Sequence, residues 1–312
     1  PIDTNLATWG TTLAMKTLED GTPSAYDWLL GQQYQEVHPF TNAAPGGWAW
    51  TDLPGGVPDA DDTAGALIAL RDGVVGTDGI PLAINWLLNL QNRDGGIPTF
   101  CRGWGTLPFD RSTPELTAHA LLAWWLWESD VPEDLRSRIR TATMHALRYL
   151  AKVQRADGSW IPLWFGNEHT RDEENPVYGT AQVVAYLCGH RDLREQARGL
   201  IASGTAYLAQ AQHASGGWGG GPGVSCSIEE TAVALHALAL AGADSKTLLP
   251  AIAWLLDATQ DGTHFPPAPI GLYFARLWYH ERLYPVIWTL QALQSAKAAL
   301  SFVSPADTNS QP

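Results

Sequence analysis

One short pattern recurs along the whole sequence, a glutamine followed by a glycine turn. Clear copies begin at Gln91, Gln154 and Gln212, with a reduced copy at Gln260 and an earlier one over residues 45–48. Apolar stretches of helical length come before and after each turn, whereas no alternation typical of strands is visible. Each repeat is therefore a helical hairpin, and the sequence predicts an all-α repeat architecture.

The helix after each turn carries its own signature. Four of these helices share a Thr-Ala pair near their start, at residues 63–64, 117–118, 180–181 and 231–232. Counting residues 12–15 and 284–288 as the first and last helices of this kind gives six hairpins. Six hairpins can close into an (α/α)6 barrel, which leaves no terminal repeat in need of a polar cap. We expect one such domain over residues 1–300, followed by a C-terminal tail over residues 301–312.

Three carboxylates precede the first Thr-Ala pair, at Asp59, Asp61 and Asp62. Like charges this close cannot all ionise cheaply, so at least one should keep its proton near neutral pH. A protonated carboxyl that is shielded from water is a proton donor. The plainer interpretation is an acidic helix N-terminus, which the helix dipole also favours.

Ring closure predicts where these acids lie. Equivalent helices present equivalent ends, so the residues two before each threonine should surround one mouth; these are Asp61, Glu115, Tyr178 and Glu229. His119 comes four residues after Glu115 and shares its helix face. We therefore expect His119 to reach Asp61 on the neighbouring repeat, although a buried histidine can also be an ordinary core residue.

Composition excludes several classes of function. The formal net charge of −13 argues against binding to nucleic acid or electrostatic attachment to anionic lipid. Three scattered cysteines form no zinc or disulfide pattern, which fits a reducing compartment. No signal peptide is evident and no apolar run reaches the length of a membrane span. We expect a cytoplasmic protein with at most peripheral membrane contact.

These motifs resemble squalene–hopene cyclases and the wider class II terpene cyclases. Residues 59–64 match the Asp-x-Asp-Asp-Thr-Ala box, and residues 115–119 match the acidic-x-Thr-Ala-His segment. The glutamine repeat over residues 154–160, with Trp164 after it, is also similar. Further matches follow in family order at residues 178–180, 227–232, 265–266 and 283–285. Triterpene cyclases have two such helical domains and this chain has room for one, as in cyanobacterial cyclases of prenylated aromatic acids.

The resemblance implies an isomerase that cyclises a polyene after protonating its terminal alkene, with no metal and no cofactor. Asp61 is the expected proton donor, and Asp59 and Asp62 hold it in place. A hydrogen bond from His119 would favour the carboxylate that develops at Asp61 and so ease proton transfer.

The resulting carbocation needs a dry pocket lined with aromatic faces. The expected lining residues are Trp48, Trp50, Phe100, Trp164, Tyr178 and Phe265, although core packing explains each of them equally well. The partner implied is a hydrophobic polyprenyl substrate, above all a geranylgeranylated aromatic acid such as prenylated dihydroxybenzoate. An acidic head group would need a cation, for which Arg102, Arg276 and Arg282 are candidates.

Three alternatives remain at this point. A class II diterpene diphosphate cyclase would use the same protonation, but its diphosphate needs a basic patch that the acid box lacks. A non-catalytic half of a two-domain triterpene cyclase would not need the intact box and histidine. A zinc prenyltransferase subunit shares the helical ring, but its metal-binding residues are not found in register.

Overall fold

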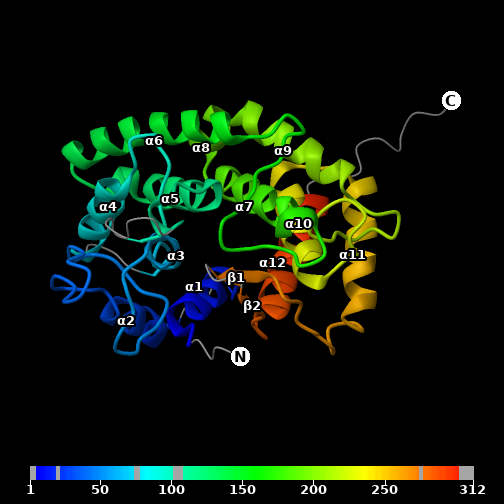
Figure 1. Ribbon diagram of the computed structural model, residues 1–312, viewed down its shortest axis with the longest axis horizontal. Coiled ribbons are helices and arrows are strands. Elements are labelled where there is room, and N and C mark those ends of the chain that lie inside the picture. The colour runs from blue at the N-terminus through cyan, green and yellow to red at the C-terminus, as the bar shows by residue number, and fades with distance from the viewer. Residues whose placement is uncertain (1–4, 19–21, 74–77, 101–107, 274–276, 302–312) are drawn as a thin grey trace.

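The computed structural model describes residues 5–18, 22–73, 78–100, 108–273 and 277–301. Six helices in this part of the chain form an inner ring, seen end-on in Figure 1. They are α1 (Ala7–Leu18), α3 (Ala60–Ala69), α5 (Pro114–Trp127), α7 (Pro176–Cys188), α10 (Ile228–Ala241) and α12 (Tyr284–Ser301). Each packs against the next, and α12 closes the ring by contacting both α10 and α1. The predicted all-α barrel is confirmed.

An outer layer surrounds this ring. It contains α2 (Pro23–Gly31), α4 (Gly79–Leu90), α6 (Glu133–Val153), α8 (Arg191–Gln196), α9 (Arg198–Gln210) and α11 (Ser245–Ala258). Helices α8 and α9 share one position between α7 and α10. Within the described ranges no outer helix follows α12 in the chain, so the sixth hairpin is represented by its inner helix alone. Most of the predicted 301–312 tail lies outside those ranges.

Burial distinguishes the two layers. Almost every residue of α5 is buried, because neighbouring helices enclose it on all sides. Helix α6 instead buries one stripe that includes Leu135, Ile139, Ala142 and Ala146, with a charged face outside. The inner helices therefore form the core, and the outer helices seal it from water.

The repeated glutamine fastens each glycine turn to the outer layer. The Gln154 amide donates to the carbonyl of Gly158 in its own turn, 3.0 Å away, and to Leu200 on α9, 3.2 Å away. Gln91 and Gln212 make the same pair of bonds at their turns. The repeat is thus a hydrogen-bonded clip between successive hairpins.

The repeated threonine fastens the turn to the inner helix. The Thr180 hydroxyl accepts from the backbone N–H of Trp160 at 2.9 Å, and Thr231 does the same for Trp218. The indole N–H of each tryptophan donates to the preceding helix, at Leu150 and Leu208. These tryptophans are fully buried plugs between the layers.

Gly158→Ala should strongly destabilise the protein. Gly158 has φ of +92°, and an added Cβ would lie 2.3 Å from the carbonyl oxygen of Ser203. We expect a loss of at least about 2 kcal/mol in the free energy of unfolding, measured by denaturant titration. Gly199 is the control, because no atom lies within 4 Å of its would-be Cβ, so Gly199→Ala should be neutral or stabilising. Equal stability of the two variants would contradict this account.

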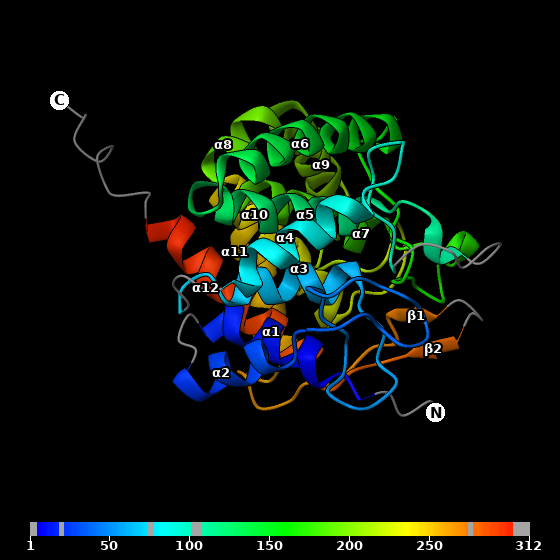
Figure 2. The same cartoon turned by 90° about the vertical axis from the view of Figure 1, so that its left-hand side faces the viewer.

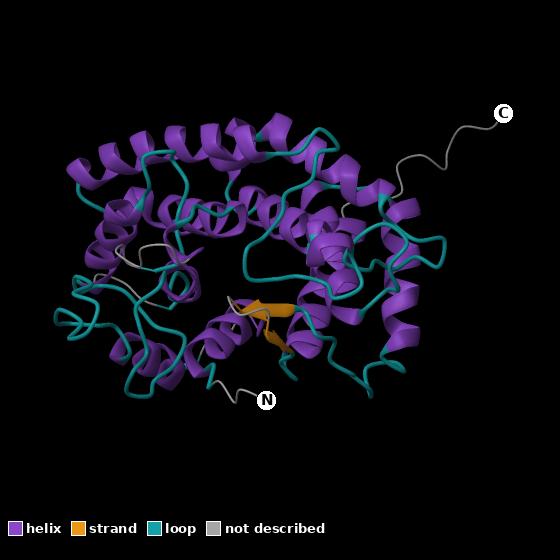
Figure 3. Cartoon of the chain, in the orientation of Figure 1, coloured by secondary structure: helices purple, strands orange, loops and turns teal. Residues whose placement is uncertain are grey.

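Long loops precede the inner helices and gather at one end of the ring, together with a small hairpin (Figure 2). The hairpin pairs β1 (Gly271–Tyr273) antiparallel with β2 (Leu277–Tyr279). No other strand pair forms a named sheet in the described part (Figure 3). Because the helices are equivalent, this loop-covered end collects all of their N-termini, including that of α3.

Candidate active site

The acid box caps helix α3. Asp59 has an extended backbone, and its carboxylate accepts from the backbone N–H of Asp62 at 2.8 Å. Its own N–H donates to the Trp48 carbonyl, and the N–H of Ala60 donates to Thr99. Short bridges therefore hold the start of α3 against the loops on both sides, which fixes the carboxyls in place.

Two of the three carboxyls are buried. Asp59 and Asp62 are each 4% exposed, and one oxygen of Asp62 has no hydrogen-bond partner. Burial raises the pKa of Asp59 to about 8. The pKa of Asp62 is also raised, first by burial and then by the charges of Asp59 and Asp61. Burial therefore favours the protonated form of both groups.

Asp61 is bonded to His119, as predicted. The His119 Nδ1 lies 2.6 Å from Asp61 Oδ1, with the imidazole 1% exposed and the carboxyl 28% exposed. Burial lowers the pKa of His119 more than its bond to Asp61 raises it, so the ring is neutral near pH 7. A neutral ring can donate from Nδ1–H to Oδ1. The second oxygen of Asp61 is then available to carry a proton.

The acids at the equivalent positions of two other repeats bind loop backbone and not a histidine. Glu115 accepts from the backbone N–H of Leu163 at 2.9 Å, and Glu229 accepts from Ala268 at 2.7 Å. Burial raises the pKa of both glutamates to about 7. They anchor the loops that cover the ring, whereas Asp61 holds no loop and is bonded to a histidine.

A chain of four rings, the loop aromatic cluster, lies beside the acid box; it comprises Trp50, Phe100, Phe109 and Trp164. Successive centroids are 6.1, 5.0 and 5.4 Å apart. The Trp164 indole donates to the Thr99 hydroxyl at 2.6 Å. Phe100 pairs through its backbone with Asp59, which places the cluster next to the carboxyls. Three of the predicted lining residues are thus brought together.

A second group, the ring aromatic cluster, comprises Phe165, Tyr178, Tyr284 and Trp288. Tyr178 stacks on Phe165 with centroids 4.0 Å apart, and Tyr284 stacks on Trp288 at 4.4 Å. The Tyr284 hydroxyl accepts from the Trp9 indole at 2.9 Å. Of this group only Tyr178 was expected. The others come from a loop and from α12, where the Thr-Ala signature is absent.

Two predicted lining residues lie elsewhere. The Trp48 indole is fully buried and donates to Leu29 on α2, so it is a plug of the same kind as Trp160. Phe265 is partly buried in the loop before β1, and no ring contact joins it to either cluster in the described structure. Of the three arginines, Arg282 is exposed, whereas Arg102 and Arg276 lie outside the described residues.

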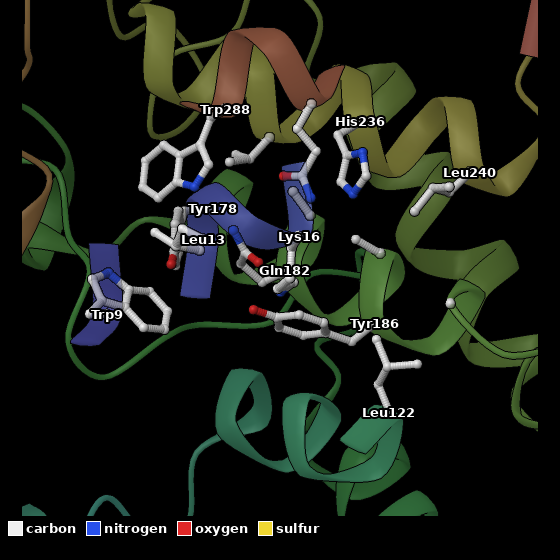
Figure 4. A pocket seen from close by; sticks show the side chains of 15 residues that line it. Trp9, Leu13, Lys16, Leu122, Tyr178, Gln182, Tyr186, His236, Leu240 and Trp288 are labelled. Atoms are coloured by element: carbon white, nitrogen blue, oxygen red, sulfur yellow. The ribbon is translucent and has the colours of Figure 1, made fainter. Parts of the chain in front are cut away.

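A cavity of about 110 Å³ lies along the ring, among α1, α7, α10 and α12 (Figure 4). One water needs about 15 Å³ by this measure, so several could fit. Trp9, Tyr178 and Trp288 line one part of it, and Lys16 and His236 another. We call it the axial cavity. Sequence reasoning missed Lys16, because only the closed ring brings it to the interior.

No helix in the described ranges is long and apolar enough to cross a membrane. No group of three or more histidine, cysteine, aspartate or glutamate side chains there is arranged to hold a metal ion.

Curated relatives of this chain are named as cyclases and synthases. Enfumafungin synthase efuA of Hormonema carpetanum is 27% identical over 86% of this chain and 23% of its own length. Squalene–hopene cyclase of Bradyrhizobium diazoefficiens is 26% identical over 90% of this chain and 48% of its own length. Drimenyl diphosphate synthase of Streptantibioticus cattleyicolor is 32% identical over 69% of this chain and 37% of its own length. The chain thus spans less than half the length of each of these three.

Solved structures share the fold. Type II terpene cyclase MstE from Scytonema has a TM-score of 0.65 and 17% identity, over 94% of this chain and 88% of its own. ent-Copalyl diphosphate synthase from Streptomyces platensis has a TM-score of 0.69 and 22% identity, over 94% of this chain and 51% of its own. The family model for the squalene-hopene cyclase C-terminal domain matches residues 2–297 of this chain. The chain belongs to the squalene–hopene cyclase C-terminal domain family.

Proposed function

We propose that this chain is a class II terpene cyclase in which Asp61 protonates the terminal alkene of a polyprenyl chain. The observation that carries the proposal is the 2.6 Å bond between Asp61 and His119. It leaves one carboxyl oxygen of Asp61 for the proton, while the histidine supports the carboxylate that forms when the proton leaves.

The reaction is an isomerisation. The Asp61 proton forms a new C–H bond at the terminal alkene, and the next alkene supplies electrons for each ring-closing C–C bond. A final C–H bond breaks and its proton goes to a base, so no atom is gained or lost. Because burial favours the protonated forms of Asp59 and Asp62, the carboxylate that forms at Asp61 faces less negative charge than two ionised neighbours would create.

The carbocation is stabilised by aromatic faces. The loop aromatic cluster lies against the acid box, and the ring aromatic cluster contains Tyr178 at the matching N-terminal position of α7. Each desolvated ring contributes on the order of 1–2 kcal/mol to a nearby cation. The loops anchored by Glu115 and Glu229 would exclude water while the cation exists.

The substrate we favour is a geranylgeranylated aromatic acid. The Scytonema cyclase, whose chain is matched over 88% of its length, is described in complex with geranylgeranyl dihydroxybenzoate. One carboxylate needs one cation, and the exposed Arg282 lies immediately before α12 at the loop-covered end. A single arginine fork is enough to pair with a carboxylate.

A prenyl diphosphate is the second candidate, because drimenyl diphosphate synthase is 32% identical to part of this chain. A diphosphate carries more negative charge and needs several cations. Lys16 is the one lysine or arginine among the residues that line the axial cavity, which is too few for a diphosphate there.

We propose that residues 1–300 form the catalytic domain and act in the cytoplasm, with peripheral contact at a membrane that holds the substrate. Exposed apolar side chains on the loop between α2 and α3 support such contact; they are Val37, Phe40 and Leu53. Phe40 is 83% exposed, so most of its ring is available to an apolar surface.

Incubation of the pure protein with geranylgeranylated dihydroxybenzoate, geranylgeranyl diphosphate and squalene tests the function. We expect a cyclised product from the first, identified by mass spectrometry and NMR, at the same rate with and without EDTA, because proton transfer supplies the electrophile. Turnover that is lost on chelation and restored by magnesium would favour the diphosphate. No product from any of the three would overturn the proposal.

A further inference from the structure

Lys16 is a charged side chain that the proposed chemistry leaves unused. It lies in the last turn of α1 and lines the axial cavity with Tyr186 and His236, as Figure 4 shows. Among the described residues its ammonium has no hydrogen-bond or ion-pair partner. Placing an unpaired ammonium inside a helical ring is costly, so its position calls for a physical explanation.

The ammonium is connected to the acid through two rings. Lys16 Nζ lies 5.3 Å from the centre of the Tyr186 ring. That ring stacks on His119, with centroids 4.3 Å apart and planes 11° from parallel. His119 in turn holds Asp61 at 2.6 Å. Four side chains from four inner helices thus form one contiguous group.

We infer that Lys16 is a positioning residue for proton transfer, whose charge stabilises the carboxylate that forms at Asp61 and keeps His119 uncharged as the hydrogen-bond donor. The inference rests on the proposed protonation by Asp61. Lys16 does not contact the substrate in this scheme. It acts through the electric field and through Tyr186.

The position of the charge suits this role. Asp61 is in the first turn of α3, beside the loop aromatic cluster, whereas Lys16 is in the last turn of the parallel helix α1. The first cation, which forms beside the loop aromatic cluster, and the ammonium therefore lie on opposite sides of Asp61 along the ring, whereas Tyr178 and Trp288 share the axial cavity with Lys16. An ammonium there favours the carboxylate more than it disfavours the cation, because electrostatic energy falls with distance.

The pKa shifts of Lys16 and of the two nearby histidines are consistent with this role. Burial lowers the pKa of Lys16 to about 8, although the charge of Asp61 raises it in part. The charge of Lys16 also contributes to the lowered pKa values of His119 and His236, after burial. The ammonium is therefore charged at pH 7 and loses its proton as the pH rises through about 8.

Other titratable groups surround Lys16 and must be controlled for. They are Asp61 on α3, His119 on α5, Tyr178 and Tyr186 on α7, and His236 on α10. Asp59 also titrates near pH 8. Groups whose titration does not depend on residue 16 cancel in ratios of rates between variants at each pH, whereas His119 is coupled to Lys16 and is therefore followed directly by NMR.

The test compares Lys16→Met and Lys16→Arg with the wild-type protein, with Lys297→Met as the control because Lys297 is exposed on α12. At pH 7 we expect Lys16→Met to lower kcat about tenfold with KM little changed, the order expected of one unit charge at an effective dielectric near 20. Lys16→Arg and Lys297→Met should stay within about twofold of wild type.

The pH dependence separates a charge from a mere packing role. As the pH rises from 7 to 9, the wild-type rate should fall toward that of Lys16→Met, whereas Lys16→Arg should keep its advantage because guanidinium stays charged. If Lys16→Met does not fold, the ratio of the Lys16→Arg rate to the wild-type rate at each pH still tests the inference. A ratio that does not change with pH would overturn the inference.

A second readout needs no substrate. NMR titration of His119 should show a higher imidazole pKa in Lys16→Met than in wild type, because a nearby positive charge has been removed. An unchanged His119 titration would overturn the inference, even if the rate fell. Failure of the wild-type protein to cyclise any substrate would instead refute the proposed function.

Discussion

Asp61→Asn is expected to abolish cyclisation, lowering kcat by at least about 10³-fold, because the amide cannot give a proton to an alkene. The amide oxygen can still accept from His119 Nδ1–H, so the geometry of the 2.6 Å bond should survive. Substrate binding and the thermal midpoint should therefore stay close to wild type. Product formation under single-turnover conditions measures the loss, and calorimetry measures the binding.

Glu229→Gln is the matched control for that experiment. Glu229 has the same place in its repeat as Asp61, but its carboxylate only accepts from the backbone N–H of Ala268. A glutamine oxygen can accept the same bond, so turnover should remain within a few fold of wild type. Near-wild-type turnover by Asp61→Asn, or loss of activity in Glu229→Gln alone, would show that the acid has been misassigned.

The fold could be predicted because the residues that repeat in the sequence are those that form hydrogen bonds between successive helical hairpins. Gln154 must reach its turn and the next outer helix, and Thr180 must reach the turn from the inner helix. Residues with such fixed partners recur at fixed places, so they locate four of the six inner helices, and the first and last helices follow from their place in the chain. The split of one outer position into α8 and α9 has no repeated signature, because outer helices need only an apolar stripe.

The contact between Asp61 and His119 was predictable for the same reason. Asp61 has a fixed place in the repeat, and His119 is one helical turn beyond the equivalent Glu115. Closure of the ring then brings His119 to within 2.6 Å of Asp61. Lys16 and Tyr186 could not be found this way, because their positions are not shared between repeats.

The aromatic residues were harder to assign, although the repeat does contain a signal. Trp48, Trp160 and Trp218 each follow a glycine turn and donate an indole bond to an outer helix. A tryptophan at that place is therefore structural. Trp164 falls outside the pattern and joins the loop aromatic cluster, as Trp50 does. Position within the repeat thus separates Trp48 from Trp164 where composition cannot.

His119→Phe should lower kcat about ten- to a hundredfold and leave the product unchanged. The phenyl ring can keep the stack on Tyr186, now 4.3 Å between centroids, but it cannot donate to Asp61. A hydrogen bond to a charged group contributes about 1.5–3 kcal/mol, which sets the size of the effect. Because the imidazole is only 1% exposed, it does not shape the path of the cation. Rates and product ratios from the same incubations check both claims.

His119→Asn distinguishes lost donation from lost packing. The asparagine amide can donate to Asp61 but cannot stack on Tyr186, so a higher rate than His119→Phe would assign the effect to the hydrogen bond. A lower rate than His119→Phe would assign it to the stack with Tyr186. New or prematurely quenched products in either variant would contradict the account, since they would place His119 on the surface that folds the substrate and not behind the acid that starts the reaction.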